Sequence, residues 1–243
     1  MPLPKIDLPT ERVLLPSNNK EVLIRPFLVK EEKILLRALT SDDKVDITDA
    51  TKQIVNNCVV TPGFDVDSTT IYDLEYLLLK LRIVSVGEKL KLKFLPMETS
   101  TCEECKNQRE VEVDMNEAKV VFPEGHEKKI ALTDKIGIVL KDPEAKIMSE
   151  FSAAQSSTVL SDMLKVIWKC VDYVYDEDTI TSAKDVSVEE GVEFLEGLRS
   201  EQFKKIDKFF KTLPKLTLSV PIKCSKCEFQ DSYVIDRLED FFG

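Results

Sequence analysis

Apolar and polar residues follow two different periods along this chain, and the period predicts where strands and helices lie. Residues 90–94 alternate leucine or phenylalanine with lysine, and residues 110–114 alternate valine with acids, as in strands with one buried face. Residues 29–39 instead repeat apolar positions every three to four residues, which predicts an amphipathic helix. By the same criteria we predict further strands at 12–15, 21–27, 120–122, 130–132, 136–140, 216–220 and 233–235, and helices at 46–58, 70–82, 157–170, from Ser187 onward, and 201–213. Asp46 is the expected N-cap of the 46–58 helix, and Ser187 with Glu190 forms an expected capping box.

Two short cysteine motifs lie inside predicted strand pairs. Cys102 and Cys105 separate the first alternating pair, and Cys224 and Cys227 separate the last. Two thiolates three positions apart on a tight turn can face one point, and four of them form the tetrahedral sulfur cage that Zn²⁺ prefers. We therefore predict one structural zinc ion bound by all four cysteines. Because 118 residues separate the two motifs, this ion would join distant parts of the chain, unlike the ion of a compact zinc ribbon.

Other interpretations of the cysteines remain open. The N-terminus lacks an apolar signal segment and no run approaches transmembrane length, which favours a reducing compartment. There, CxxC pairs bind metal or perform redox chemistry more often than they form structural disulfides. Disulfides, unrelated thiols and a redox role are the alternatives to zinc. Cys58 and Cys170 lie on helical patterns and are expected to be buried small apolar side chains.

The two halves of the chain present similar elements in the same order. In each half a helix ends in a Cys-Val pair, an acidic linker and another helix follow, and two strands then flank a CxxC motif. Such self-similarity suggests a duplicated unit, although two helix-then-hairpin segments can also match by chance. We predict an extended arm at 1–10, a first α+β unit at 11–118 and a second at 119–243, which could pack as one domain. The expected fold class is α+β, with duplicated helix-plus-β-hairpin units joined by a four-cysteine, zinc-ribbon-like site.

Composition argues against several classes of function. The 44 acidic and 34 basic residues give a net charge of −10, which disfavours broad contact with nucleic acid or polyanions, and membranes are equally unexpected partners. The only histidine, His126, lies in a polar turn and is expected to be solvent-exposed, so little supports a histidine-based catalytic site. No phosphate-binding glycine motif occurs, and a four-cysteine zinc site leaves no position for a substrate. We expect a non-enzymatic protein without a small-molecule substrate.

Protein–protein contacts are then the expected mode of action. The predicted contact surface comprises the helix faces around Trp168 and around Phe209 and Phe210, together with the C-terminal residues 238–243. Adjacent aromatic residues at 241 and 242 favour an interface anchor, with a tucked terminal helix as the alternative. The proline-containing arm is expected to lie on a neighbouring chain.

A family resemblance is carried by residues 14–36, which contain an Ile-Arg-Pro-Phe run, and by residues 73–88, which precede the first CxxC motif. These segments resemble the baseplate hub proteins of T-even-like contractile-tail bacteriophages, closely over about residues 10–115 and more loosely up to the second CxxC motif. The resemblance implies a structural or assembly role in the tail baseplate hub, with other baseplate or hub proteins as partners. It also implies location in the virion or, during assembly, in the host cytoplasm, and no enzymatic activity. The alternative is a zinc-ribbon accessory factor of a phage replication or transcription complex, which a basic stripe around the cysteines would favour; the charges there are mixed.

Overall fold

The computed structural model describes residues 7–39, 44–94, 102, 109–156, 159–224 and 226–241, and these form a mixed α+β fold. The elements are, in order, β1 (Glu11–Leu14), β2 (Glu21–Ile24), α1 (Val29–Leu39), α2 (Lys44–Cys58), α3 (Ile71–Val86), β3 (Lys89–Phe94), β4 (Arg109–Asp114), η1 (Met115–Glu117), β5 (Lys119–Val121), β6 (Lys129–Ala131), β7 (Gly137–Leu140), η2 (Ala145–Ile147), α4 (Met148–Ser156), α5 (Leu160–Lys169), β8 (Val171–Tyr175), β9 (Ile180–Ser182), η3 (Ala183–Asp185), α6 (Val188–Glu196), α7 (Ser200–Lys211), β10 (Lys215–Lys223), β11 (Gln230–Ile235) and η4 (Leu238–Phe241).

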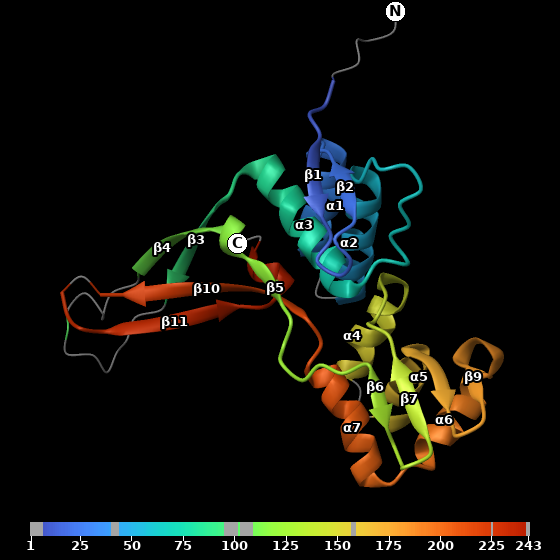
Figure 1. The fold of residues 1–243 in the computed structure, drawn as a ribbon. Coiled ribbons are helices and arrows are strands. Elements are labelled where there is room, and N and C mark those ends of the chain that lie inside the picture. The colour runs from blue at the N-terminus through green and yellow to red at the C-terminus, as the bar shows by residue number, and fades with distance from the viewer. Residues whose placement is uncertain are drawn as a thin grey trace, which may run out of the picture.

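The N-terminal part packs the antiparallel β1–β2 hairpin against α1, α2 and α3 (Figure 1). α3 is its central helix: Leu74, Leu77 and Leu81 are fully buried in this core, whereas Leu79 is buried in a second core on another side of the helix. A helix that is apolar on most sides is buried on most sides. The side chain of Thr70 caps α3 by accepting the backbone N–H of Asp73, 3.3 Å away.

A buried ion pair holds β2, α1 and α2 together. Nη2 of Arg25 lies 3.1 Å from Oε1 of Glu31, whose side chain is fully buried, and the same guanidinium donates to the carbonyl of Asn57 at 2.7 Å. Burial acts to raise the pKa of Glu31, but hydrogen bonds from Arg25 and from the backbone N–H of Leu28 outweigh burial and hold this pKa below its usual range. The ionised pair therefore belongs to the folded state at neutral pH.

The C-terminal part combines a four-stranded antiparallel sheet, in the order β6-β7-β8-β9, with α4 to α7. Trp168, Ile206 and Phe209 lie in its core and are at most 4% exposed. α6 approaches α5 very closely, because a Cβ added to Gly191 would lie 2.0 Å from the indole ring of Trp168. This glycine is required by close packing rather than by a turn.

Two hairpins, β3–β4 and β10–β11, project together from the body at the left of Figure 1. Their facing apolar residues form one core with Leu79 and Phe241, and Phe94 of β3 packs edge-on against Tyr233 of β11 with ring centroids 5.7 Å apart. On β3–β4, each lysine stands opposite an acid: Lys89 with Asp114, Lys91 with Glu112, and Lys93 with Glu110. Opposite charges across a strand pair stabilise that register. The alternating sequence thus sets both the buried face and the pairing.

The order of elements repeats in the two halves of the chain. The β1–β2 hairpin is followed by α1 and α2, and the β6–β7 hairpin is followed by α4 and α5. In each half the end of the second helix returns to the end of the hairpin's second strand. The backbone N–H of Arg25 donates to the carbonyl of Cys58 at 2.9 Å, and the N–H of Lys141 donates to that of Cys170 at 2.8 Å. The helix directly before the β10–β11 hairpin is α7, and the helix directly before the β3–β4 hairpin is α3.

Most elements agree with the sequence predictions, but several placements differ. α2 begins at Lys44, so Asp46 is not its N-cap, and α4, β8 and β9 were not predicted. The prediction of exposed aromatic faces was wrong for Trp168, Phe209 and Phe241, which are 4%, 2% and 0% exposed. These large rings fill the cores of the C-terminal part and of the paired hairpins, where they exclude more water than at a surface. Phe242 lies outside the described residues.

Candidate metal centre

The second cysteine motif forms the turn of the β10–β11 hairpin. β10 ends at Lys223, and the backbone N–H of Cys224 donates to the carbonyl of Phe229 at 3.0 Å, which closes the turn. Within it, the backbone N–H of Lys226 points at the Sγ atom of Cys224 at 3.4 Å. A backbone N–H directed at a sulfur stabilises its thiolate form, which is the form that binds metal.

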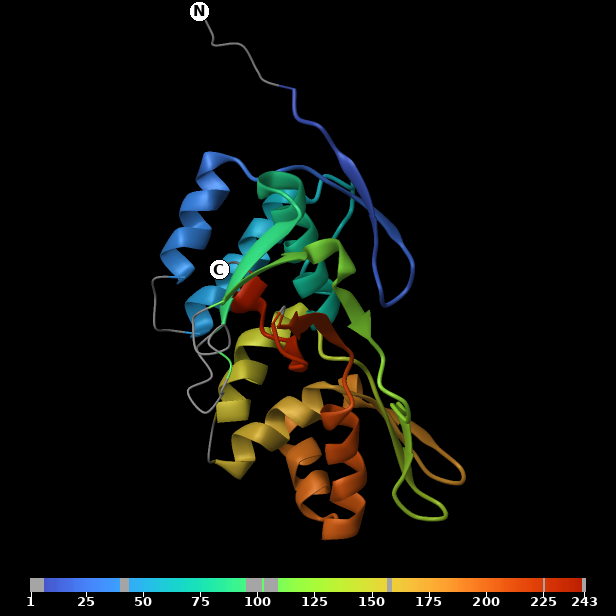
Figure 2. The same ribbon diagram turned by 90° about the vertical axis from the view of Figure 1, so that its left-hand side faces the viewer.

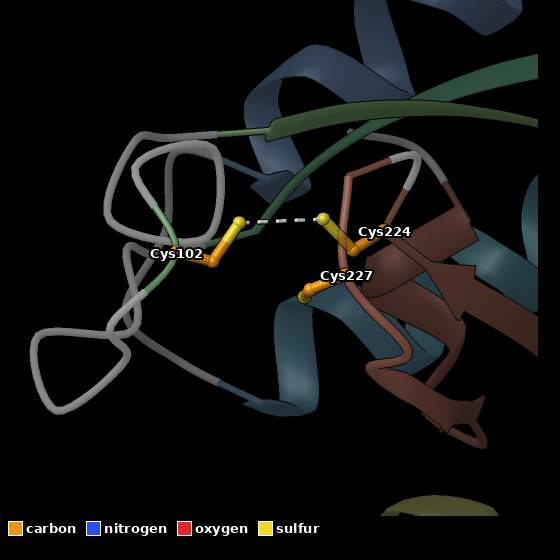
Figure 3. Close-up of side chains that lie close together, drawn as sticks. All are labelled: Cys102, Cys224 and Cys227. Carbon is orange, nitrogen blue, oxygen red and sulfur yellow. Dashed lines mark hydrogen bonds between the residues drawn. The ribbon is translucent and has the colours of Figure 1, made fainter.

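The first motif comes from the segment joining β3 to β4, of which Cys102 is described and Cys105 is not. Because the two hairpins pack side by side, Cys102 meets the second motif (Figure 3). Its Sγ lies 3.8 Å from that of Cys224, and the Sγ atoms of Cys102, Cys224 and Cys227 all lie within 4.8 Å of one another. Residues separated by 122 positions in the sequence thus converge at one point.

The spacing of these sulfurs fits a tetrahedral metal ion. Zinc–sulfur bonds of about 2.3 Å place the sulfurs of a tetrahedral site roughly 3.8 Å apart, the separation of Cys102 and Cys224. A disulfide would require a sulfur–sulfur distance of about 2 Å. Three of the four predicted ligands are therefore brought together in an arrangement that could hold a metal, and all three are partly buried. Cys105 lies outside the described residues.

The other two cysteines have a different environment. Cys58 and Cys170 are fully buried, as predicted, and burial raises the pKa of their thiols to about 11 and about 12. Both remain protonated at neutral pH, so they are poor metal ligands and poor nucleophiles. Each lies at the end of its helix, and Nη1 of Arg25 donates to Sγ of Cys58 at 3.6 Å.

His126 is not the exposed loop residue that its polar sequence context predicts. Its side chain is 10% exposed and stacks on Phe209, with Nε2 3.3 Å from Oδ1 of Asp142 and Nδ1 3.2 Å from Oγ1 of Thr212. Asp142 also accepts the hydroxyl of Tyr72 at 2.9 Å. This cluster joins α3 to the end of α7. The sequence carried no signal of it, because each partner lies far from the others along the chain.

The hydroxyl of Thr212 links this histidine to the end of α7. Thr212 is the C-cap of α7, and its hydroxyl donates to the carbonyl of Lys208 at 2.9 Å. The cluster has the form of a buried hydrogen-bond network that joins the two halves of the molecule.

A protein-family model described as T4 bacteriophage base plate protein matches residues 9–243. The chain belongs to this family. The membership confirms the resemblance seen in the sequence: this is a structural protein of a T4-like phage baseplate, located in the virion tail and in contact with other baseplate proteins. Neither a curated protein nor a solved structure matches the chain. Among the described residues of this T4-like baseplate protein, no helix has the length and apolar character needed to span a membrane.

Proposed function

We propose that this chain is a structural or assembly protein of the baseplate hub that acts by protein–protein contacts, without enzymatic activity. The proposal also includes one structural zinc ion held by Cys102, Cys105, Cys224 and Cys227. Membership of the baseplate family supports the location, and the convergence of three of these sulfurs supports the metal. A replication or transcription accessory factor, the alternative function, receives no support from the family.

The position of the cysteines suggests what the zinc would contribute. Beneath them, residues of both hairpins share an apolar layer with Leu79 of α3. Zinc at the tips would fix the far end of the two hairpins, so that they project as one rigid unit. A rigid element presents a preorganised surface and loses little entropy on binding, which suits a structural subunit. The ion itself would supply no catalysis, because four sulfurs complete its coordination.

The repeated order of elements supports a duplicated unit, with copies at 11–118 and 119–243. The backbone hydrogen bonds accepted by the carbonyls of Cys58 and Cys170 occupy the same position in each copy. Each copy supplies one hairpin and one cysteine motif, so the ion sits where the copies meet. Duplication thus accounts for the long insert between the motifs.

Metal analysis of the purified chain tests the zinc site. We expect about one zinc ion per chain, its loss in Cys224→Ser and in Cys105→Ser, and its retention in the control Cys170→Ala, whose side chain is buried elsewhere. The ligand variants should lose several kcal/mol of stability in the presence of zinc, because binding energy adds to the folded state. A zinc-free wild-type protein, or equal zinc in Cys224→Ser, would contradict the site.

The hub role has a separate test. Host cells infected by a phage that lacks this protein should accumulate unattached heads and incomplete baseplates. The wild-type chain supplied from a plasmid should restore complete tails, which controls for effects on neighbouring genes. Normal infectious tails in its absence would refute the role, whatever the metal content of the protein.

A further inference from the structure

An apolar groove lies between α4, α5 and α7. It encloses about 230 Å³, and three phenylalanines from two of these helices line it: Phe151 of α4, and Phe203 and Phe210 of α7. Phe151 and Phe210 pack against each other with ring centroids 6.3 Å apart. Met163 of α5 completes the wall and is 37% exposed. The groove therefore offers aromatic and thioether surface to a ligand from outside.

One polar pair borders this groove. Asp207 and Lys211, one turn apart on α7, form an ion pair and both line the groove. These two charges neutralise each other, so the groove favours an occupant that is mainly apolar.

The N-terminal segment has this chemistry. Four of its first eight residues are large and apolar, three prolines occur in its first ten, and its only charged side chains before Thr10 are Lys5 and Asp7. Residues 7–10 form no regular secondary structure and are exposed. Leu8 in particular is 36% exposed and belongs to none of the described cores.

The prolines of the segment favour binding in a groove over pairing with the edge of a sheet. The described sheets have edge strands at β5 and β11, at β6 and β9, and at both strands of the β1–β2 and β3–β4 hairpins. A proline lacks the N–H needed to pair with a strand, so Pro2, Pro4 and Pro9 make the segment a poor addition to any of these edges. Proline-rich segments instead favour the polyproline II conformation, which docks in aromatic-lined grooves. Among these surfaces the phenylalanine-lined groove is the one that fits.

The groove and the segment lie at different ends of one molecule. In both Figure 1 and Figure 2, residues 7–10 leave the body beyond β1 at the top, whereas α5 and α7 lie in the lower half. We propose that residues 1–10 of one copy bind in the groove between α4, α5 and α7 of another copy. Reciprocal exchange of the segments would close a two-fold pair, whereas one-way exchange would build rings or open chains of subunits.

Sedimentation equilibrium of the full-length protein tests this contact. We expect reversible self-association that is weakened about tenfold or more both by the triple change Leu3→Ser, Ile6→Ser and Leu8→Ser and by Met163→Glu, which places a charge in the groove. Ile180→Glu is the matched control: this side chain is 73% exposed on β9, and its change should leave association intact. A monomeric wild-type chain at about 100 µM, or association unaffected by either test variant, would overturn the proposal.

A peptide experiment locates the binding site independently of the oligomer. A labelled synthetic peptide of residues 1–10 should bind the triple arm variant, as measured by fluorescence anisotropy, and should not bind the same variant that also carries Met163→Glu. Circular dichroism of that variant should match the wild-type spectrum, because Met163 lies at the surface. Peptide binding that persists undiminished would place the arm elsewhere and refute the groove.

Discussion

Replacing Gly191 by alanine tests the close contact of α6 with Trp168 of α5. The new Cβ would lie 2.0 Å from the ring of Trp168, so the helix or the ring must move roughly 1.4 Å to restore a 3.4 Å contact. Trp168 is 4% exposed and enclosed by its core, so this movement disturbs the packing of α5 on α6. Overpacking a core costs about 1–3 kcal/mol of stability. Because this contact is so short and the ring is rigid, we expect a cost of about 3 kcal/mol.

Alanine also favours the helix over glycine by about 1 kcal/mol, so we expect Gly191→Ala to lose about 2 kcal/mol in the free energy of unfolding. For a chain of this length, that loss lowers the melting temperature by about 4–8 °C. Trp168 is the only tryptophan, so its fluorescence follows unfolding of this core directly. Circular dichroism should report the same transition.

Gly197→Ala is the matched control. Gly197 ends α6 with a φ of −70°, and its added Cβ would come no nearer than 3.4 Å to the carbonyl oxygen of Phe194. We therefore expect a change within about 1 kcal/mol, of either sign. If Gly191→Ala were as stable as the wild type, the close approach of α6 to Trp168 would be refuted.

Two further changes test the buried ion pair and the C-terminus. Glu31→Gln leaves the buried charge of Arg25 without its partner and should cost about 3–5 kcal/mol in the free energy of unfolding at pH 7. The folded pKa of Glu31 is depressed below 4.5, so the wild type should lose this advantage as the pH falls through the folded pKa. Urea titrations at a series of pH values should therefore show the stabilities of the two proteins converging at low pH. A difference that is independent of pH would contradict the ionised pair. Phe241→Ala should cost about 3–5 kcal/mol because the ring is fully buried, whereas Phe122→Ala, at a 53% exposed ring, should cost about 1 kcal/mol; equal urea midpoints for the two would contradict the tucked C-terminus.

Local sequence patterns predicted helices and strands better than they predicted which side chains are buried. The 29–39 helix and the capping box of Ser187 with Glu190 are confirmed, because their signals lie within a few residues of one another. The strand β8 was missed because it follows α5 with no turn signal between them, and β9 was missed because it has only three residues. His126 and Phe241 were assigned to the surface from their neighbours in sequence, but their burial depends on residues of distant elements.

The sequence could predict the ligands of the candidate metal centre but not how the fold brings them together. The CxxC spacing identified Cys102, Cys224 and Cys227, which the structure brings together. The sequence could not show what aligns the two hairpins, because that depends on apolar residues of both hairpins and of α3 meeting in one core. Cys105, the fourth predicted ligand, stays a prediction.

That shared core also sets the role that zinc can have. Small zinc domains unfold without metal because their apolar core is too small to fold alone. Here the paired hairpins bury Val220, Ile235 and Phe241 almost completely, and this layer extends to Leu79 of α3. Metal that binds only the folded chain stabilises it more as its affinity and free concentration rise, so the proposed zinc would add to a fold that the apolar layer already specifies. Removing zinc should therefore increase hydrogen exchange first at the hairpin tips near Cys224 and leave α3 protected; simultaneous loss of protection in α3 would show that the metal specifies the fold.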